Sequence, residues 1–459
     1  VSFLTDRDPQ AVMILRGSAG TGKTSLSGAI VRTLLQIRQK VMLLAPTGRA
    51  AKVFSLGSGA PAYTIHRRIY REKAFAGVDG QFSLNDNLYT DTLFMVDEAS
   101  MIANMGLGGT TFGSGCLLDD LVKFVYQGHN DRLLLIGDKA QLPPVGEEES
   151  PALSASVMEG YGLKVYECDL NEVLRQSQSS GILYNATLIR QMISHDAVTG
   201  LPLIRFKGFA DIVMMPGAEL VESLGDSYHH VGMDETMVIT RSNKRANIYN
   251  NGIRNMVLDR EEELSSGDML MIVKNNYFWT EKEKKESGEG SAGAVPAFLA
   301  NGDRAKVLRV SNYIELYGFR FATLLLQLPD YDDYEMQVTG MLDTLQSEAP
   351  ALTHEQQDEL FRQVEEDYQH FVPLKADRMK SIRQDAYFNA LQIKYAYAVT
   401  CHKAQGGQWA HVYVDQGYMT DDMLTPDYIH WLYTAFTRAT DKLFLVNWPK
   451  EQTSEPTDL

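Results

Sequence analysis

Apolar residues gather in short continuous runs along this chain, and polar or helically spaced segments separate the runs. Four of them lie at residues 11–15, 41–45, 93–96 and 133–136. Runs of this length without alternation are typical of strands that a parallel sheet buries on both faces. Residues 26–35, between the first two runs, place apolar side chains at helical spacing. Strands that alternate with helices predict an α/β fold with a parallel sheet.

The first run leads directly into a glycine-rich octapeptide. The octapeptide is Gly17-Ser18-Ala19-Gly20-Thr21-Gly22-Lys23-Thr24, and Ser25 follows it. The glycines let backbone N–H groups surround phosphate oxygens at a helix N-terminus, Lys23 supplies a point charge, and the Thr24 hydroxyl suits Mg²⁺. A chance glycine-rich turn is the alternative, but here a strand, a Gly-Lys-Thr sequence and a helix coincide. We therefore predict a nucleoside-triphosphate site.

Two later strands end in polar side chains that suit hydrolysis. Asp97 and Glu98 follow the strand at 93–96, and Gln141 follows the strand at 133–136. Asp97 can hold the Mg²⁺ shell while Glu98 polarises the attacking water, and Gln141 can sense the terminal phosphate or that water. A solvated turn is the usual setting of an Asp-Glu pair. The position of this pair after a buried strand, downstream of Lys23, favours catalysis instead.

The strand at 41–45 ends in Pro46 and Thr47. Because ligands of parallel sheets bind at the carboxyl ends of the strands, these two residues are candidates for contact with a polymer or partner. His66 opens a basic helix start, and a helix-cap or core histidine is an equal alternative for it. The polar residues 77–92 that follow predict a small inserted subdomain.

The composition limits the class of protein. The chain has 459 residues, 44% hydrophobic and 22% charged, a size that normally forms more than one core. Cys116, Cys168 and Cys401 lie far apart without metal-ligand spacing, so we expect reduced thiols. No apolar run is long enough to cross a bilayer and no signal sequence is evident, so we expect a soluble, cytoplasmic protein.

The net charge of −16 argues against a broad nucleic-acid-binding surface. Much of the acidity is local, because the stretch from Asp330 to Asp367 also contains Asp332, Asp333, Glu335, Asp343, Glu348, Glu355, Asp358, Glu359, Glu365 and Glu366. A confined basic cleft elsewhere in the chain stays compatible with this composition.

The ordered set of motifs resembles superfamily-one helicases of the RecD-like and Dda-like group. The segments that carry the resemblance, besides the octapeptide and Asp97-Glu98, are residues 137–145, 170–176, 237–243, 396–406 and 431–439. Their order along nearly the whole chain is more specific than any one motif. Two positions depart from the family: Gln10 lies too close to Gly17 to be its adenine-reading glutamine, and Gln408 stands where many relatives have Glu.

The resemblance implies two RecA-like parallel-sheet P-loop NTPase motor domains. We expect the first at residues 1–180, with a small insertion at about 66–92, and the second at 181–300 and 394–459. Residues 301–393 are expected to form an SH3-like β-barrel, with short strands at 304–309 and 319–328, and an acidic helical subdomain over 330–367.

The resemblance also implies the roles of the site residues. The expected catalytic residues are Lys23, Asp97, Glu98, Gln141, Arg175 and Arg438. ATP would be bound by Gly17, Ala19, Gly20, Thr21, Gly22, Lys23, Thr24, Ser25, Gln405 and Gly406, and Mg²⁺ by Thr24 and Asp97. The nucleic-acid contacts would come from Pro46, Thr47, Thr64, His66, Thr240, Asn243, His402 and Lys403. ATP bound between two domains would let Arg175 and Arg438 neutralise charge on the transferred phosphoryl group only when the cleft closes. A structural salt bridge is the alternative for either arginine.

The implied activity is ATP-dependent translocation 5′ to 3′ on single-stranded DNA with unwinding of duplexes. The expected partners are single-stranded DNA and duplex junctions, without a membrane, for a monomer that acts in DNA repair or recombination. Two alternatives stay open, an RNA-directed helicase and a nucleotide-dependent nucleic-acid-binding protein that does not unwind.

Overall fold

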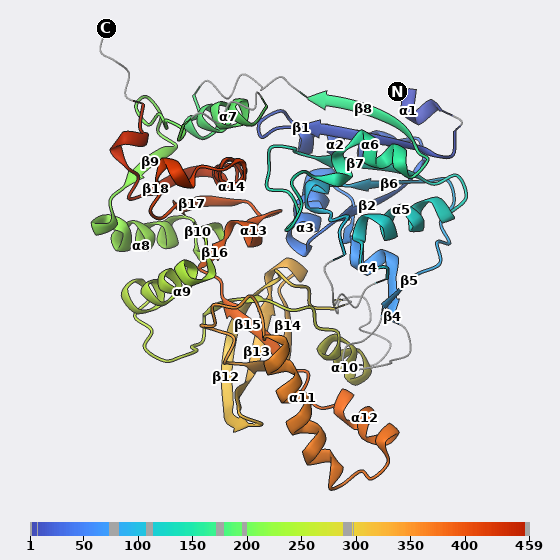
Figure 1. The fold of residues 1–459 in the computed structure, drawn as a ribbon, viewed down its shortest axis with the longest axis vertical. Helices are drawn as coiled ribbons and strands as arrows, with labels where there is room; N and C mark the ends of the chain where they lie inside the picture. Colours follow the sequence, from blue (N-terminus) through green and yellow to red (C-terminus); the bar gives the residue numbers. More distant parts are fainter. Residues whose placement is uncertain are drawn as a thin grey trace. The chain divides into compact units, whose positions relative to one another are not determined.

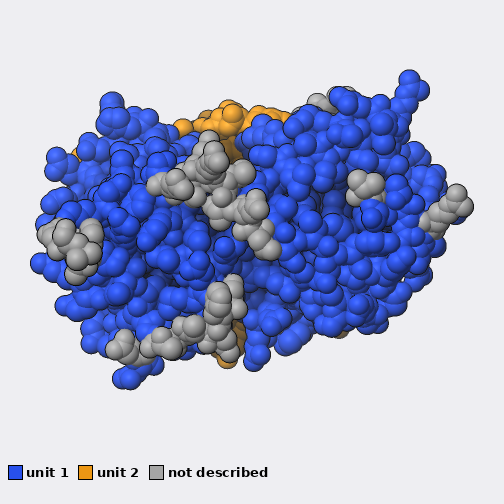
Figure 2. Space-filling view, turned by 90° about the horizontal axis from the view of Figure 1, so that it is seen from above, with its two compact units in different colours: residues 1–239, 401–459 blue, residues 240–400 orange. Residues whose placement is uncertain are grey.

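A computed structural model gives the fold and describes residues 2–6, 8–72, 82–106, 113–170, 179–194, 200–287, 296 and 298–454 (Figure 1). The chain divides into two compact units (Figure 2). Unit 1 comprises residues 1–239 and 401–459, and unit 2 comprises residues 240–400.

The N-lobe of unit 1 is a six-stranded sheet with the strand order β3-β2-β6-β7-β1-β8. Its strands are β1 (Ala11–Gly17), β2 (Lys40–Ala45), β3 (Ala62–Thr64), β6 (Thr92–Val96), β7 (Arg132–Gly137) and β8 (Lys164–Leu170). All neighbouring strands run parallel. The four predicted strands are therefore confirmed, and the side chains of residues such as Val12, Leu44 and Phe94 are fully buried, as unalternated apolar runs require.

Helices cover this sheet and lead to its loops. They are α1 (Ser2–Thr5), α2 (Lys23–Gln36), α3 (Gly48–Ser58), α4 (Ile65–Ile69), α5 (Leu117–Gln127) and α6 (Ala155–Gly160). Val31 and Leu34 of α2 and Phe54 of α3 pack with strand residues in one core cluster. A two-stranded sheet of β4 (Tyr70–Glu72) and β5 (Phe82–Leu84) lies in the expected insertion.

The C-lobe of unit 1 is built on β9 (Ile212–Met215), β10 (Thr236–Thr240), β17 (Trp409–Asp415) and β18 (Ala439–Val446). β17 pairs in parallel with β18, and β18 in parallel with β9. Its helices are α7 (Gly181–Ser194), α8 (Leu220–His230), α13 (Cys401–Ala404) and α14 (Pro426–Phe436). The two parallel sheets confirm the predicted α/β class.

Unit 2 contains a closed five-stranded barrel. Its strands are β11 (Met269–Ile272), β12 (Arg304–Leu316), β13 (Phe319–Leu328), β14 (Tyr334–Met341) and β15 (Leu391–Tyr395). The expected barrel is thus confirmed, and its strands extend past both ends of the expected insertion at 301–393. Helices α9 (Asn243–Gly252) and α10 (Phe278–Ser287) belong to the same unit.

The prediction of a helical stretch over residues 330–367 was partly wrong. β14 occupies its first part, and the helix α11 (His354–Gln369) starts only after it, followed by α12 (Lys375–Arg383). Alternation explains the strand, because Met336 and Val338 are buried while Glu335 and Gln337 between and beside them are exposed. Leu360, Val364 and Ile382 pack the two helices against the barrel residue Phe321.

Candidate nucleotide-binding site

The glycine-rich octapeptide forms the turn between β1 and α2. Gly20 and Gly22 have φ angles of 77° and 84°, a backbone conformation that side chains other than glycine rarely adopt. A Cβ atom at Gly17 would lie 2.6 Å from Thr21 Oγ1. Lys23 Nζ donates to the carbonyls of Gly17 at 2.5 Å and Ser18 at 3.0 Å. The loop thus presents a lysine and the free N–H groups of a helix N-terminus, which together suit a phosphate group.

Asp97 and Glu98 stand at the carboxyl end of β6. Asp97 Oδ1 accepts from the Glu98 N–H at 2.9 Å, and Glu98 has a φ of 51°. Burial, aided by the neighbouring Glu98 carboxylate, raises the pKa of Asp97 to about 7. Glu98 Oε2 is buried and has no hydrogen-bond partner among the described residues. Such orphaned carboxylate oxygens fit a site that gains a cation and a water when a ligand binds.

The loop after β7 brings a further carboxylate to the phosphate loop. Asp138 Oδ2 lies 3.9 Å from Lys23 Nζ, and Asp138 Oδ1 accepts from the Ala140 N–H at 3.0 Å. Gln141 is 4% exposed, and its Oε1 has no partner within the described part of the chain. Among the described residues no group of three or more His, Cys, Asp or Glu could hold a metal ion. Mg²⁺ in nucleotide sites commonly combines one or two protein ligands with phosphate oxygens and waters.

The C-lobe contacts the phosphate loop directly through α14. The Tyr433 hydroxyl accepts from the Ala19 N–H at 2.9 Å and donates to Asp138 Oδ2 at 2.6 Å. Burial and the Asp138 carboxylate raise the pKa of Tyr433 well above its usual range, so this hydroxyl keeps its proton. Thr434 Oγ1 accepts from the Leu142 N–H at 2.8 Å. The two lobes therefore share hydrogen bonds at the predicted nucleotide site.

Arg438 has its hydrogen-bond partners within the C-lobe in this structure. Its side chain is almost fully buried, and Nε donates to the Thr434 carbonyl at 3.1 Å. Nη1 donates to the Gly407 carbonyl at 3.1 Å and Nη2 to Thr437 Oγ1 at 3.2 Å. The guanidinium thus forms hydrogen bonds at the C-terminal end of α14, within the C-lobe. It makes no hydrogen bond to a described residue of the phosphate loop. Arg175 lies outside the described residues.

Two other residues expected to bind nucleotide contact N-lobe loops instead. Gln405 is 8% exposed, and its Nε2 donates to the Leu142 carbonyl at 2.6 Å. A Cβ atom at Gly406 would lie 3.0 Å from Thr47 Oγ1. These contacts place both residues against the loops that follow β7 and β2.

The N-lobe candidates for nucleic-acid contact lie at one edge of the sheet. β2 and β3 pair in parallel with Ala45 opposite Thr64, so the ends of the two strands are adjacent. Thr47, after Pro46, accepts from the Ala50 N–H and caps α3, and Thr64 caps α4 in the same way. The edge expected from the sequence exists, but both threonine hydroxyls already serve as helix caps.

Neither histidine candidate carries a full positive charge at neutral pH. Burial lowers the pKa of His66 to about 4, against an opposing effect of Asp120. Burial also lowers the pKa of His402 on α13, against Asp427. Of the candidates on the N-lobe and α13, only Lys403 can offer a permanent cation to a phosphate backbone.

The remaining two candidates belong to unit 2 and also have internal partners. Thr240 is fully buried, and its hydroxyl donates to the Ser242 carbonyl at 3.1 Å. Asn243, the first residue of α9, donates from Nδ2 to the Glu348 carbonyl at 3.2 Å. A contact of either side chain with nucleic acid would replace one of these bonds.

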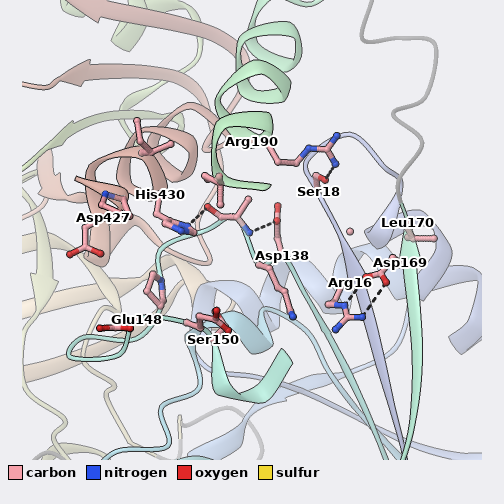
Figure 3. A pocket seen from close by; sticks show the side chains of 18 residues that line it. Arg16, Ser18, Asp138, Glu148, Ser150, Asp169, Leu170, Arg190, Asp427 and His430 are labelled. Carbon is pink, nitrogen blue, oxygen red and sulfur yellow. Dashed lines mark hydrogen bonds and ion pairs between the residues drawn. The ribbon is translucent and has the colours of Figure 1, made fainter. Parts of the chain in front are cut away.

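A cavity of about 840 Å³ opens beside the phosphate loop within unit 1 (Figure 3). Its N-lobe wall includes Gly17, Ser18 and Asp138, and its C-lobe wall includes Arg190 and His430. His430 Nδ1 is 2.9 Å from the Ala140 carbonyl. A volume of this size is in the range of small-molecule sites and suits a nucleotide.

The motifs did not identify Tyr433, Thr434, Asp138 and Arg190 as site residues. The position of Asp138 after a buried strand, like that of Asp97, was a signal that could have revealed it. Tyr433 lies within the motif at 431–439, but no pattern in the sequence reveals the contacts of Tyr433 and Arg190 with residues 18–19, because these contacts span 414 and 172 positions of the chain.

Comparison with known families agrees with this geometry. Residues 4–199 match an AAA domain, and residues 395–446 match a UvrD-like helicase C-terminal domain. The ATP-dependent RecD2 DNA helicase of Deinococcus radiodurans is 32% identical over 135 residues, 29% of this chain and 16% of that protein. The ATP-dependent DNA helicase dda of Enterobacteria phage T4 is 25% identical over 267 residues, 56% of this chain and 55% of that protein. These matches support the resemblance of the chain to superfamily-one helicases of the RecD-like and Dda-like group.

The two matched models lie in the same order along the chain as the motifs that carry the resemblance, and the AAA-domain match contains the glycine-rich octapeptide. A crystal structure of Pif1 helicase from Bacteroides in complex with ADP-AlF3 and ssDNA aligns over 98% of this chain and 92% of its own, with 14% identity and a TM-score of 0.46. None of the helices in the described ranges has the length and apolar character needed to cross a membrane.

Proposed function

We propose that this protein is an ATP- and Mg²⁺-dependent DNA helicase that translocates 5′ to 3′ on single-stranded DNA and unwinds duplexes. The observation that carries the proposal is the hydrogen-bonded contact of Tyr433 with both Ala19 and Asp138. A change at the phosphate loop must alter this contact, and α14 conveys the change to the C-lobe. Coupling of a nucleotide site to the movement of a second lobe is what distinguishes a motor from a simple ATPase.

The chemistry follows from the residues around the loop. Lys23 would exchange the Gly17 and Ser18 carbonyls for phosphate oxygens, since a charged acceptor forms the stronger bond. Thr24 and Asp97 would hold Mg²⁺, which supplies charge stabilisation for the transferred phosphoryl group. Glu98 would orient the attacking water through its unpaired Oε2, and Gln141 would contact that water or the terminal phosphate.

The nucleic acid would cross the edge formed by the ends of β2 and β3. Because His66 and His402 are largely neutral at pH 7, contacts to sugars and phosphates would come from Lys403, from dipolar groups near Pro46 and Thr47, and from the helix N-termini at this edge. Thr240 and Asn243 are the corresponding candidates in unit 2. This confined track agrees with the net charge of −16.

One set of assays tests the proposal. ATP turnover is measured with and without single-stranded DNA, and unwinding is measured on duplexes that carry a 5′ or a 3′ single-stranded tail, with Lys23→Ala as the inactive control. We expect stimulation by DNA and unwinding of the 5′-tailed substrate. Stimulation by RNA alone would favour an RNA-directed helicase, and ATP binding without turnover would favour a binding protein.

The cellular setting is part of the same proposal. A cytoplasmic monomer that acts in DNA repair or recombination would elute at the mass of one chain, 51.4 kDa, with and without nucleotide. Sensitivity of cells that lack the gene to DNA damage would test the pathway.

A further inference from the structure

Arg190 is the C-lobe cation at the phosphate loop. It lies on α7, whose start is fixed because Asp211 accepts from the Gly181 N–H at 2.7 Å and from the Ser180 hydroxyl at 2.5 Å. Along the same helix, Asn185 Nδ2 donates to the Arg205 carbonyl at 2.9 Å. α7 also packs against α14. The helix that carries Arg190 is therefore held firmly in the C-lobe.

The guanidinium of Arg190 points across the cavity to the N-lobe (Figure 3). Its Nη1 donates to Ser18 Oγ, in the second residue of the octapeptide. Arg190 is close enough to Tyr433 for its charge to oppose the rise in the pKa of that hydroxyl. The phosphate loop thus has two cations beside it, Lys23 and Arg190, and one nearby carboxylate, that of Asp138.

A general property of guanidinium groups and the cavity itself favour a phosphate as a ligand of this arginine. A serine hydroxyl is a weak acceptor for a guanidinium, whose planar fork of donors matches the oxygens of a phosphate. The cavity that Arg190 and Ser18 line is large enough for a nucleotide. Arg438, by contrast, has every hydrogen bond of its guanidinium within the C-lobe.

We propose that Arg190 transfers from Ser18 Oγ to the terminal phosphate of a bound nucleoside triphosphate, and so lets the C-lobe distinguish the triphosphate from the diphosphate. The inference rests on the proposed function in so far as a nucleotide occupies the cavity. Arg190 is a positioning residue here, since it would draw the C-lobe onto the terminal phosphate. The diphosphate has no group at this position and would leave Arg190 on Ser18.

The test is the ratio of affinities for two nucleotides, measured by titration of the full chain with fluorescent ADP and with a fluorescent non-hydrolysable ATP analogue. Arg190→Gln should lower the preference for the triphosphate analogue roughly tenfold or more, because a charge-assisted bidentate contact is lost. Arg190→Lys should retain part of the preference, since a point charge remains. The KM for ATP of Arg190→Gln should rise together with the loss of preference for the triphosphate.

Arg205→Gln is the matched control. Arg205 is a C-lobe arginine whose guanidinium lies 5.5 Å from the ring centre of Tyr184 and 5.6 Å from that of Phe209. Its loss should lower the melting temperature without a change in the nucleotide ratio. A merely structural Arg190 would behave in the same way, and that result would overturn the inference.

The remaining outcomes separate this inference from the proposed function. A parent chain that unwinds DNA while Arg190→Gln keeps the full preference for the triphosphate contradicts the role of Arg190 alone. A parent that prefers the triphosphate through Arg190 but neither hydrolyses it nor unwinds DNA contradicts the proposed function alone. A parent that binds neither nucleotide overturns both.

Discussion

The candidate site residues of the N-lobe and those of the C-lobe differ in how far the protein already provides them with hydrogen-bond partners. In the N-lobe, Glu98 Oε2 and Gln141 Oε1 are buried without a hydrogen-bond partner among the described residues. In the C-lobe, Arg438 forms three hydrogen bonds within its own lobe, and Gln405 donates to the Leu142 carbonyl. An unpaired buried polar atom is costly, so it marks a place that awaits a ligand. The comparison teaches that Glu98 and Gln141 have unused hydrogen-bonding capacity for a ligand, whereas Arg438 and Gln405 already have partners within unit 1.

The sharpest test of the N-lobe side is Glu98→Gln. The amide keeps the size of the side chain but loses the charge that orients and polarises water, so turnover should fall roughly 10²- to 10⁴-fold with nucleotide binding retained. DNA-stimulated ATP turnover and nucleotide titration on one preparation measure the two effects. Glu159→Gln, at an exposed site on α6, is the control and should match the parent. Turnover of Glu98→Gln at the parent rate would remove Glu98 from the chemistry.

The test of the C-lobe side is Arg438→Ala. Three buried acceptors lose their donor, so we expect a loss of about 3 kcal/mol in the free energy of unfolding, seen as a lower melting temperature. Activity per folded molecule should change less than stability. A variant of normal stability that loses roughly a thousandfold of its DNA-stimulated turnover would instead support the arginine-finger role that the resemblance implied.

The contact between the lobes is tested by Tyr433→Phe. Loss of the hydroxyl releases the Ala19 N–H and Asp138, so a nucleotide no longer competes with Tyr433 at the phosphate loop. Nucleotide affinity should rise roughly fivefold, because one hydrogen bond contributes about 1 kcal/mol. The stimulation of ATP turnover by DNA should weaken. Tyr428→Phe on the same helix is the control, because that hydroxyl donates to Gln416 within the C-lobe. Equal behaviour of the two variants would mean that Tyr433 does not couple the lobes.

The smallest expected effect concerns His66, an N-lobe candidate that burial keeps neutral. Its pKa is about 4 in the folded chain and near 6.5 when unfolded, so the unfolded state binds more protons between these values. The free energy of unfolding should therefore fall as the pH drops from about 6.5 to about 4. The expected loss is on the order of 1 kcal/mol, because solvent screens the charge of this partly exposed side chain. Denaturant unfolding of the parent and of His66→Gln across this range measures it, and identical pH profiles would show that His66 is exposed and titrates normally.

Much of the N-lobe could be predicted from the sequence alone. Unalternated apolar runs identified β1, β2, β6 and β7, since a strand buried on both faces must be apolar at every position. The spacing of glycines and Lys23 predicted the phosphate loop, because its function depends on the backbone of eight consecutive residues. The prediction of a helix was wrong for β14, because it relied on the acidic composition of the residues before α11. The alternation of buried and exposed residues in this segment indicates a strand instead.

Local sequence determined the strands and the phosphate loop and carries the family resemblance, because each depends on neighbouring residues or on motif order. Tertiary structure alone decided that Arg438 is enclosed in the C-lobe, that Thr47 and Thr64 cap helices, and that Tyr433 and Arg190 meet the phosphate loop. The physical reason is that a side chain's partner is set by which elements pack together. The bond between Ala19 and Tyr433 joins residues 414 positions apart, and no local pattern encodes such a pairing.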